Sequence, residues 1–305
     1  MIEYLLTFVL LLLVAPLLTG CIKSLKMFLL FKRPVSCLQN YYTFAKLLKK
    51  ELLISKEASF ITHIAPFMVL APLLVALLFL PPVSKSMAYI PFADAFTFTG
   101  LVALSGFFLM LIGLDSASSF GGIGSSREAF IAALVEPAMI LVLFSLSLMA
   151  GHIDLGGAAL AFSHHFPKEH MASFTFAAIS FFILLIAENG RIPVDNPETH
   201  LELTMVHEVM ILDIGGFYLA LVEAASSLKF TLFSAFFAAF FLPFSVGCFP
   251  IDLALFVLKL FVVALLVALI EVSTAKLRLF KVPNLLGIAI VFAFLSLISF
   301  YMLGA

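Results

Sequence analysis

Carboxylate and imidazole side chains are concentrated in the stretch from Ala187 to Gly216, which lies between two long apolar segments. Burying an ionised carboxylate in lipid costs several kcal/mol, so charged residues beside membrane segments usually serve a function. These residue types predict either a site that handles protons or a surface that binds a partner. The candidate residues are Glu188, Arg191, Asp195, Glu198, Glu202, His207 and Glu208.

The local pattern of this stretch predicts a break followed by a short helix. Two prolines four residues apart interrupt the preceding apolar segment, and the second suits the first turn of a new helix. In that helix Glu198 and Glu202 would share one face, and His200 and His207 another. Two imidazoles without a third ligand at a familiar spacing are a weak metal signature, so proton handling or an interface is favoured over a metal site.

Further charged residues lie inside or at the ends of the apolar segments, namely Asp115, Glu136, Lys259 and Glu271. Pro137 follows Glu136, removes one backbone hydrogen bond and is expected to kink the helix there. Together with Glu188, these residues predict a hydrated acidic path from the cytoplasmic surface toward the membrane centre. The alternatives are that Glu188 and Glu271 mark helix ends, and that Lys259 reaches outward past Asp252.

A glycine-rich stretch at residues 121–128 precedes the fourth apolar segment. Ser125 and Glu128 have the spacing of a capping box and predict that a helix begins there. The stretch has neither the GxGxxG pattern nor the lysine of a phosphate-binding loop, so phosphate binding is not expected. Arg127 is expected either to pair with Asp115 and the acidic stretch or to anchor the cytoplasmic side.

The elements that must position these residues are membrane helices. Apolar residues make up 63% of the 305 residues and charged residues 11%, against about 45–50% and about 25% in soluble proteins. We therefore expect an all-α polytopic membrane protein, a single integral domain over 1–305, with eight transmembrane helices near residues 3–22, 62–81, 95–114, 130–151, 172–190, 230–247, 252–272 and 284–303. The first segment is interpreted as a retained helix rather than a cleaved signal peptide.

Most lysines and arginines fall in the connections after odd-numbered segments, whereas the opposite connections hold only Lys85 and Lys168. This bias predicts both termini outside a cell inner (cytoplasmic) membrane, with a long acidic cytoplasmic loop at about 188–229. Apolar residues recur at helical spacing within 38–53. This segment is either an amphipathic helix on the cytoplasmic membrane surface or a loop helix packed on a neighbour.

Composition also limits partners and cofactors. The net charge of −1 argues against a nucleic-acid partner. The three cysteines are scattered and include no CxxC pair, so no iron–sulfur cluster is expected in this chain alone.

The motif of the acidic stretch resembles that of a known family of membrane proteins. The pattern AExxRxPxDxPE resembles the loop between the fifth and sixth helices of the eight-helix membrane subunit of respiratory complex I. It is formed here by Ala187, Glu188, Arg191, Pro193, Asp195, Pro197 and Glu198. The variant PVDNPETHLELTMVHE more specifically resembles the homologous subunit of membrane-bound group 4 [NiFe] hydrogenases, of the formate hydrogenlyase subunit 4 and hydrogenase-4 component C type. Supporting stretches at 113–116, 126–129, 135–137 and 271–278 extend the likeness through all eight segments.

The resemblance implies a non-catalytic subunit that anchors a hydrophilic hydrogenase arm and helps couple its electron transfer to proton or sodium movement. The implied partners are the hydrogenase large and small subunits, an iron–sulfur electron-transfer subunit, antiporter-like membrane subunits and lipid. The nickel–iron centre and the iron–sulfur clusters would lie in those partners. In this interpretation the acidic stretch docks the arm, with Arg191 as counter-charge, and Glu136, Lys259 and Glu271 continue inward.

Two alternatives remain open. A complex I-type NADH dehydrogenase subunit with a quinone site would carry an aromatic residue where Val194 stands. An independent cation-coupled secondary transporter would be expected to show two repeats with paired broken helices, and the sequence has no convincing internal repeat.

Overall fold

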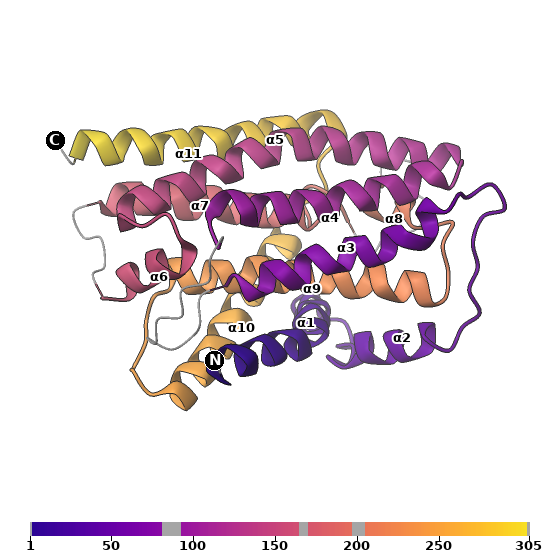
Figure 1. Cartoon of the computed structure of the whole chain (residues 1–305), viewed down its shortest axis with the longest axis horizontal. Coiled ribbons are helices and arrows are strands. Elements are labelled where there is room, and N and C mark those ends of the chain that lie inside the picture. The colour runs from indigo at the N-terminus through magenta and orange to yellow at the C-terminus, as the bar shows by residue number, and fades with distance from the viewer. Residues whose placement is uncertain (1, 81–92, 165–169, 197–204, 304–305) are drawn as a thin grey trace.

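The computed structural model describes residues 2–80, 93–164, 170–196 and 205–303, and within them the chain is almost entirely helical. Both ends of the chain lie at the left-hand end of the bundle in Figure 1, whereas α2 and α8 lie toward the right. The helices are α1 (Ile2–Leu29), α2 (Gln39–Leu47), α3 (Ile61–Leu78), α4 (Ala95–Asp115), α5 (Ser119–Ala150), α6 (Leu155–His164), α7 (Met171–Glu188), α8 (His207–Met210), α9 (Phe217–Phe241), α10 (Phe249–Ser273), the 3₁₀ turn η1 (Leu279–Lys281) and α11 (Val282–Leu303).

Eight helices in the described part of the chain are long and apolar enough to cross a membrane: α1, α3, α4, α5, α7, α9, α10 and α11 together with η1. The predicted all-α fold with eight spans is therefore confirmed. Which side of the membrane each end faces stays a prediction. In the described part of the chain, β-structure is limited to two isolated bridges, Ile54 with Ile214 and Asp94 with Asp154.

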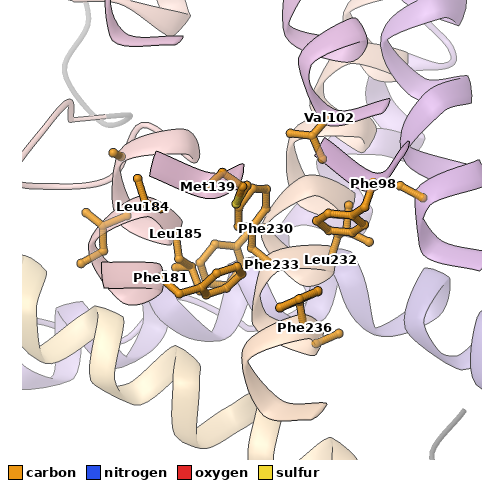
Figure 2. Packing of buried hydrophobic residues seen from close by; sticks show 14 of the residues in the cluster. Phe98, Val102, Met139, Phe181, Leu184, Leu185, Phe230, Leu232, Phe233 and Phe236 are labelled. Atoms are coloured by element: carbon orange, nitrogen blue, oxygen red, sulfur yellow. The ribbon is translucent and has the colours of Figure 1, made fainter. Parts of the chain in front are cut away.

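Helix α9 is the centre of the bundle, because it has the largest buried share of any span, 78% of its apolar window. Aromatic side chains of α9 meet residues of α4, α5 and α7 in a dry core (Figure 2). The Phe181 and Phe236 rings stack with their centroids 4.9 Å apart. Dispersion contacts between such interlocking rings fix how the surrounding helices approach α9.

The start of α5 differs from the prediction. The helix begins at Ser119, because the side chain of Ser118 caps it by accepting a hydrogen bond of 3.0 Å from the Gly121 N–H. The predicted start at Ser125 is therefore wrong, and Ser125 instead donates to the Met110 carbonyl at 2.8 Å. The glycines allow close packing of α5 on α4, since a Cβ at Gly121 would overlap the Gly113 carbonyl oxygen.

Helix α9 also begins earlier than predicted, at Phe217, so the connection after α7 ends at Gly216 rather than at about residue 229. Hydropathy missed the first three turns because they carry Glu223 and Lys229. The Lys229 ammonium lies 2.7 Å from the Glu188 carboxylate, which allows a charged residue inside a buried helix.

Helix α2 packs against the middle of α1. The Asn40 amide donates to the Thr19 hydroxyl at 2.7 Å, and the Tyr41 hydroxyl donates to the Leu13 carbonyl. Tyr42 and Leu48 remain exposed on α2 and just beyond it. Of the two expectations for this segment, packing on a neighbour is observed, and contact with the membrane surface stays a prediction.

Candidate functional site

The connection 189–216 is the segment between α7 and α9. Backbone hydrogen bonds join each of its ends to a different loop of the chain. Near its start, the Leu277 N–H donates to the Pro193 carbonyl at 2.8 Å, which joins it to the segment after α10. Near its end, the Gly215 N–H donates to the Leu53 carbonyl at 2.9 Å, which joins it to the segment before α3. Segments far apart in the sequence therefore hold the described parts of this connection against the bundle.

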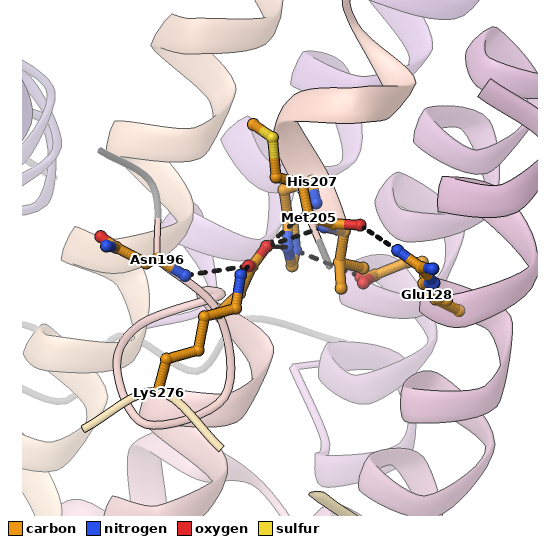
Figure 3. A network of polar contacts seen from close by, with 8 residues as sticks. Glu128, Asn196, Met205, His207 and Lys276 are labelled. Atoms are coloured by element: carbon orange, nitrogen blue, oxygen red, sulfur yellow. Dashed lines mark hydrogen bonds and ion pairs between the residues drawn. The ribbon is translucent and has the colours of Figure 1, made fainter. Parts of the chain in front are cut away.

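Asp195 is the centre of a buried polar network (Figure 3). Its carboxylate lies 2.9 Å from the Lys276 ammonium and 3.7 Å from Nδ1 of His207. It also accepts backbone hydrogen bonds from Asn196 at 2.9 Å and from Val206 at 3.0 Å. Burial by itself would raise the pKa of this carboxyl, but His207 and Lys276 hold it well below its usual value.

His207 joins this carboxylate to a second one on α5. Its Nε2 lies 3.3 Å from the Glu128 carboxylate, which is buried. Burial alone would lower the imidazole pKa, but the charges of Glu128 and Asp195 outweigh it and raise the pKa of His207 to about 10. His207 is therefore a cation at neutral pH.

Gly190 makes room for this imidazole. Its φ of +54° is a conformation that side chains with a Cβ rarely adopt. A Cβ at Gly190 would lie 2.5 Å from Nδ1 of His207. Next to the network, the Arg127 guanidinium donates to the Met205 carbonyl at 2.9 Å and attaches the same segment to α5.

A second buried cluster surrounds Glu271 near the end of α10. Its carboxylate lies 3.5 Å from the Lys26 ammonium of α1 and 3.4 Å from the Arg191 guanidinium. Arg191 also lies over the Phe230 ring of α9, 5.0 Å from its centroid. The start of the connection is thus tied to three spanning helices at once.

The third charged pair, Glu188 with Lys229, borders a cavity of about 40 Å³. These two residues, together with Asn189 and His207, form the charged and amide part of its wall, and residues of α3, α4 and α9, among them Ser105 and Ser226, form the rest. Since one water needs about 10–15 Å³, the cavity has room for roughly two or three water molecules. The protonated imidazole and the Glu188 carboxylate therefore line one small cavity whose wall is otherwise mainly apolar.

Glu136 lies half-buried near the middle of α5. It is close enough to Glu188 for the two carboxylates to repel each other. In the described part of the chain, Glu136 has no hydrogen-bond or ion-pair partner. It is the carboxylate here that lacks a counter-charge.

Two predicted path residues lie apart from this site. The Asp115 carboxylate accepts four hydrogen bonds of 2.5–3.0 Å from Ser59 and Thr62, and so caps the start of α3. The Lys259 ammonium donates to the Phe244 carbonyl at 2.6 Å, in the connection before α10. Along α10 it is about 18 Å from Glu271, at 1.5 Å per residue.

The residues predicted to dock a partner have different positions. Arg191 and Asp195 are buried inside the chain, so they support the connection from beneath. Glu208 lies in α8, and its carboxylate repels that of Glu223 in α9. Glu198 and Glu202, together with His200, lie outside the described residues.

Sequence reasoning did not assign several residues to the site, namely Lys26, Glu128, Lys229 and Lys276, and it predicted for Glu128 only a role in a helix cap. Lys229 had a usable signal, since a lysine within an apolar stretch needs a buried partner. The others appeared as ordinary loop or helix-end charges. Among the residues described, no group of three His, Cys, Asp or Glu side chains is arranged to hold a metal ion.

Known proteins match this chain over nearly its whole length. The NADH dehydrogenase family model matches residues 4–302. Hydrogenase-4 component C of Escherichia coli (strain K12) is 30% identical over 276 residues, covering 88% of this chain and 85% of that protein. Formate hydrogenlyase subunit 4 of the same organism is 28% identical over 292 residues, covering 94% of each chain.

A solved structure shares the fold. A chain of the membrane-bound sulfane sulfur reductase, an archaeal respiratory membrane complex, superposes with a TM-score of 0.82 at 16% identity, covering 97% of this chain and 98% of that chain. The resemblance inferred from the loop motif is confirmed by the family match. This multi-pass membrane protein therefore belongs to the NADH dehydrogenase family and is homologous to hydrogenase-4 component C and formate hydrogenlyase subunit 4.

Proposed function

We propose that this chain is the membrane subunit of a hydrogenase complex, where it anchors a hydrophilic [NiFe]-hydrogenase arm and helps couple electron transfer to movement of protons or sodium ions. Two curated relatives are named as hydrogenase and formate hydrogenlyase components. In the proposed assembly the nickel–iron centre and iron–sulfur clusters belong to the large, small and electron-transfer subunits. Antiporter-like membrane subunits complete it.

The observation that carries the proposal is the buried network beneath the connection 189–216. Asp195, Lys276, His207 and Glu128 join this connection to the segment after α10 and to α5. A segment clamped in this way presents a fixed surface to a soluble arm. Binding to a pre-organised surface costs less ordering entropy than binding to a loose loop.

Coupling in this proposal proceeds through His207, Glu188 and Glu136. The imidazole contacts the Asp195 network on one side and lines the cavity beside Glu188 and Lys229 on the other. A shift of the connection would therefore change the charge facing Glu188, whose own charge is matched by Lys229. Glu136 has no such counter-charge among the described residues and is therefore the residue suited to exchange a proton. We leave Lys259 out, because its ammonium is directed to the opposite end of α10.

Co-purification tests the proposal. A tagged chain is solubilised in mild detergent, and its partners are identified by mass spectrometry alongside a hydrogen-evolution assay. Recovery of a nickel–iron large subunit with activity is expected. Recovery with quinone-dependent dehydrogenase subunits, or of the chain alone, would contradict the proposal and favour a complex I-type subunit or an independent transporter respectively.

A further inference from the structure

After α1 the chain turns back along the helix that it has just left. The Asn40 side chain donates to Thr19, and the backbone of Cys37 lies directly against Gly20. A Cβ at Gly20 would overlap the Cys37 carbonyl oxygen and lie 3.5 Å from the Cys37 Cα. Glycine is therefore what allows this close approach.

The return brings two thiols into contact. The Cys37 side chain is hydrogen-bonded to that of Cys21, and both residues are partly buried. The third cysteine, Cys248, is exposed and lies at the start of α10. Cys21 is fixed on a long helix, whereas Cys37 lies in the non-helical connection 30–38. A disulfide needs the two sulfurs about 2.05 Å apart, and Cys37, which lies outside any helix, is the residue that would move to reach that distance.

We propose that Cys21 and Cys37 form a reversible oxidation site, in which hydrogen peroxide converts their thiols to an intramolecular disulfide. One thiol attacks the peroxide, its O–O bond breaks, and a sulfenic acid and one water are formed. The second sulfur then displaces the hydroxyl group from the sulfenic sulfur, which leaves as a second water. The two thiols lose two electrons and two protons in total, and a dithiol reductant reverses the step.

The disulfide would close the segment 22–36 into a loop that contains Lys26. Lys26 is one of the two cations that contact Glu271. The proposed oxidation site therefore has one of its cysteines on the same helix, α1, as part of the Glu271 cluster. A cross-link there ties the end of α1 to the start of α2. The inference does not depend on the proposed function.

Thiol counting on the chain in detergent-solubilised membranes, with whatever subunits remain bound to it, tests this proposal. Each free thiol adds one increment on a denaturing gel after reaction with a polyethylene-glycol maleimide. The reduced chain should show three increments, one for each free cysteine. After brief treatment with hydrogen peroxide and removal of the excess, only the increment of Cys248 should remain. Dithiothreitol should restore the other two, which distinguishes a disulfide from irreversible sulfinic acid.

Two variants serve as controls. Cys248→Ser should lose both of its increments on oxidation, and Cys37→Ser should keep both. Three increments in the oxidised native chain, a peroxide effect in Cys37→Ser equal to that in the native chain, or a disulfide-linked dimer of the Cys248→Ser variant on a non-reducing gel would each overturn the proposal.

Discussion

At the scale of single residues, His207 determines how the connection 189–216 is held. Its imidazole is shared by carboxylates from two elements, Glu128 and Asp195, and its high pKa keeps it charged. A neutral side chain in its place would leave two buried carboxylates with one cation fewer. The site therefore depends on a protonated imidazole and on the glycine that admits it.

Replacing Gly190 by alanine tests that dependence. The new Cβ would meet the His207 ring and force a residue with a side chain into a left-handed conformation, at a cost of roughly 1–3 kcal/mol. We expect faster proteolysis within the connection and less soluble arm bound. Gly122→Ala is the matched control, since a Cβ there meets nothing within 4 Å. Equal proteolysis of the two variants would contradict the predicted role of Gly190.

The same network predicts a wide pH range of stability. The pKa of His207 is raised, so its contribution is complete below the unfolded value of about 6.5 and is lost as pH rises through about 10. The pKa of Asp195 is lowered, so its contribution is present above about 3.9 and is lost as pH falls further. Hydrogen exchange of the segment 205–216, corrected for intrinsic rates, should be protected between about pH 5 and 9. A loss of protection between about pH 6 and 8, as expected for an unpaired histidine, would contradict a charged His207 paired with two carboxylates.

At the scale of elements, paired charges stabilise helices that apolar composition alone would not place in a membrane. Helix α9 carries Lys229 among buried phenylalanines because Glu188 of α7 neutralises it. Glu271 plays the corresponding part for α10, with cations from α1 and from the connection. Removing one member of such a pair leaves the other charge buried without a counter-charge, which destabilises the fold.

Lys229→Met should therefore destabilise the protein by about 3–5 kcal/mol, because it leaves Glu188 buried without a cation. Adding Glu188→Gln to that variant should recover much of the loss. Lys49→Met, at an exposed position, is the control and should be nearly neutral. Thermal unfolding in detergent measures all three. An unchanged melting temperature for Lys229→Met would mean that the pair does not stabilise the fold.

Sequence patterns predicted the spans well and the polar contacts poorly, for physical reasons. Apolar length is a local property, so eight helices were predictable from windows of hydropathy. The starts of α5 and α9 were not, since one depends on a serine cap and the other on a charge pair with a distant helix. The acidic motif located the site, but the partners of Asp195 come from residues far along the chain. Only the fold brings Lys276 beside it.

At the scale of the whole molecule, the connection 189–216 joins spans α7 and α9 and is attached through its charges to α5, to Glu271 of α10 and to the segment after α10. Both chain ends lie on the side of the bundle away from α2 and α8, at the left in Figure 1, although they are apart from each other. This arrangement separates a fixed, polar end from a predominantly apolar body. It suits a subunit that binds a soluble arm at one end and passes charge movement to neighbouring membrane subunits.

Attachment of the arm is predicted to depend on the clamp beneath the connection. Lys276→Met removes the closest cation from the Asp195 carboxylate, which lies 2.9 Å away. We expect a loss of about 1–3 kcal/mol in the local network and less hydrogenase large subunit recovered with the tagged chain. Lys50→Met, at an exposed position, is the control. Equal recovery for both variants would show that the arm does not depend on this clamp.

The most direct test of coupling is the amount of ion moved per hydrogen evolved in inverted membrane vesicles. Native vesicles are compared with those carrying Glu136→Gln, and with Glu57→Gln as an exposed-carboxylate control. Our account predicts that Glu136→Gln leaves the complex assembled and hydrogen-evolving but lowers the ions moved per hydrogen toward zero, with Glu57→Gln unchanged. A native ratio in an assembled Glu136→Gln complex would contradict the proposed part of Glu136 in coupling.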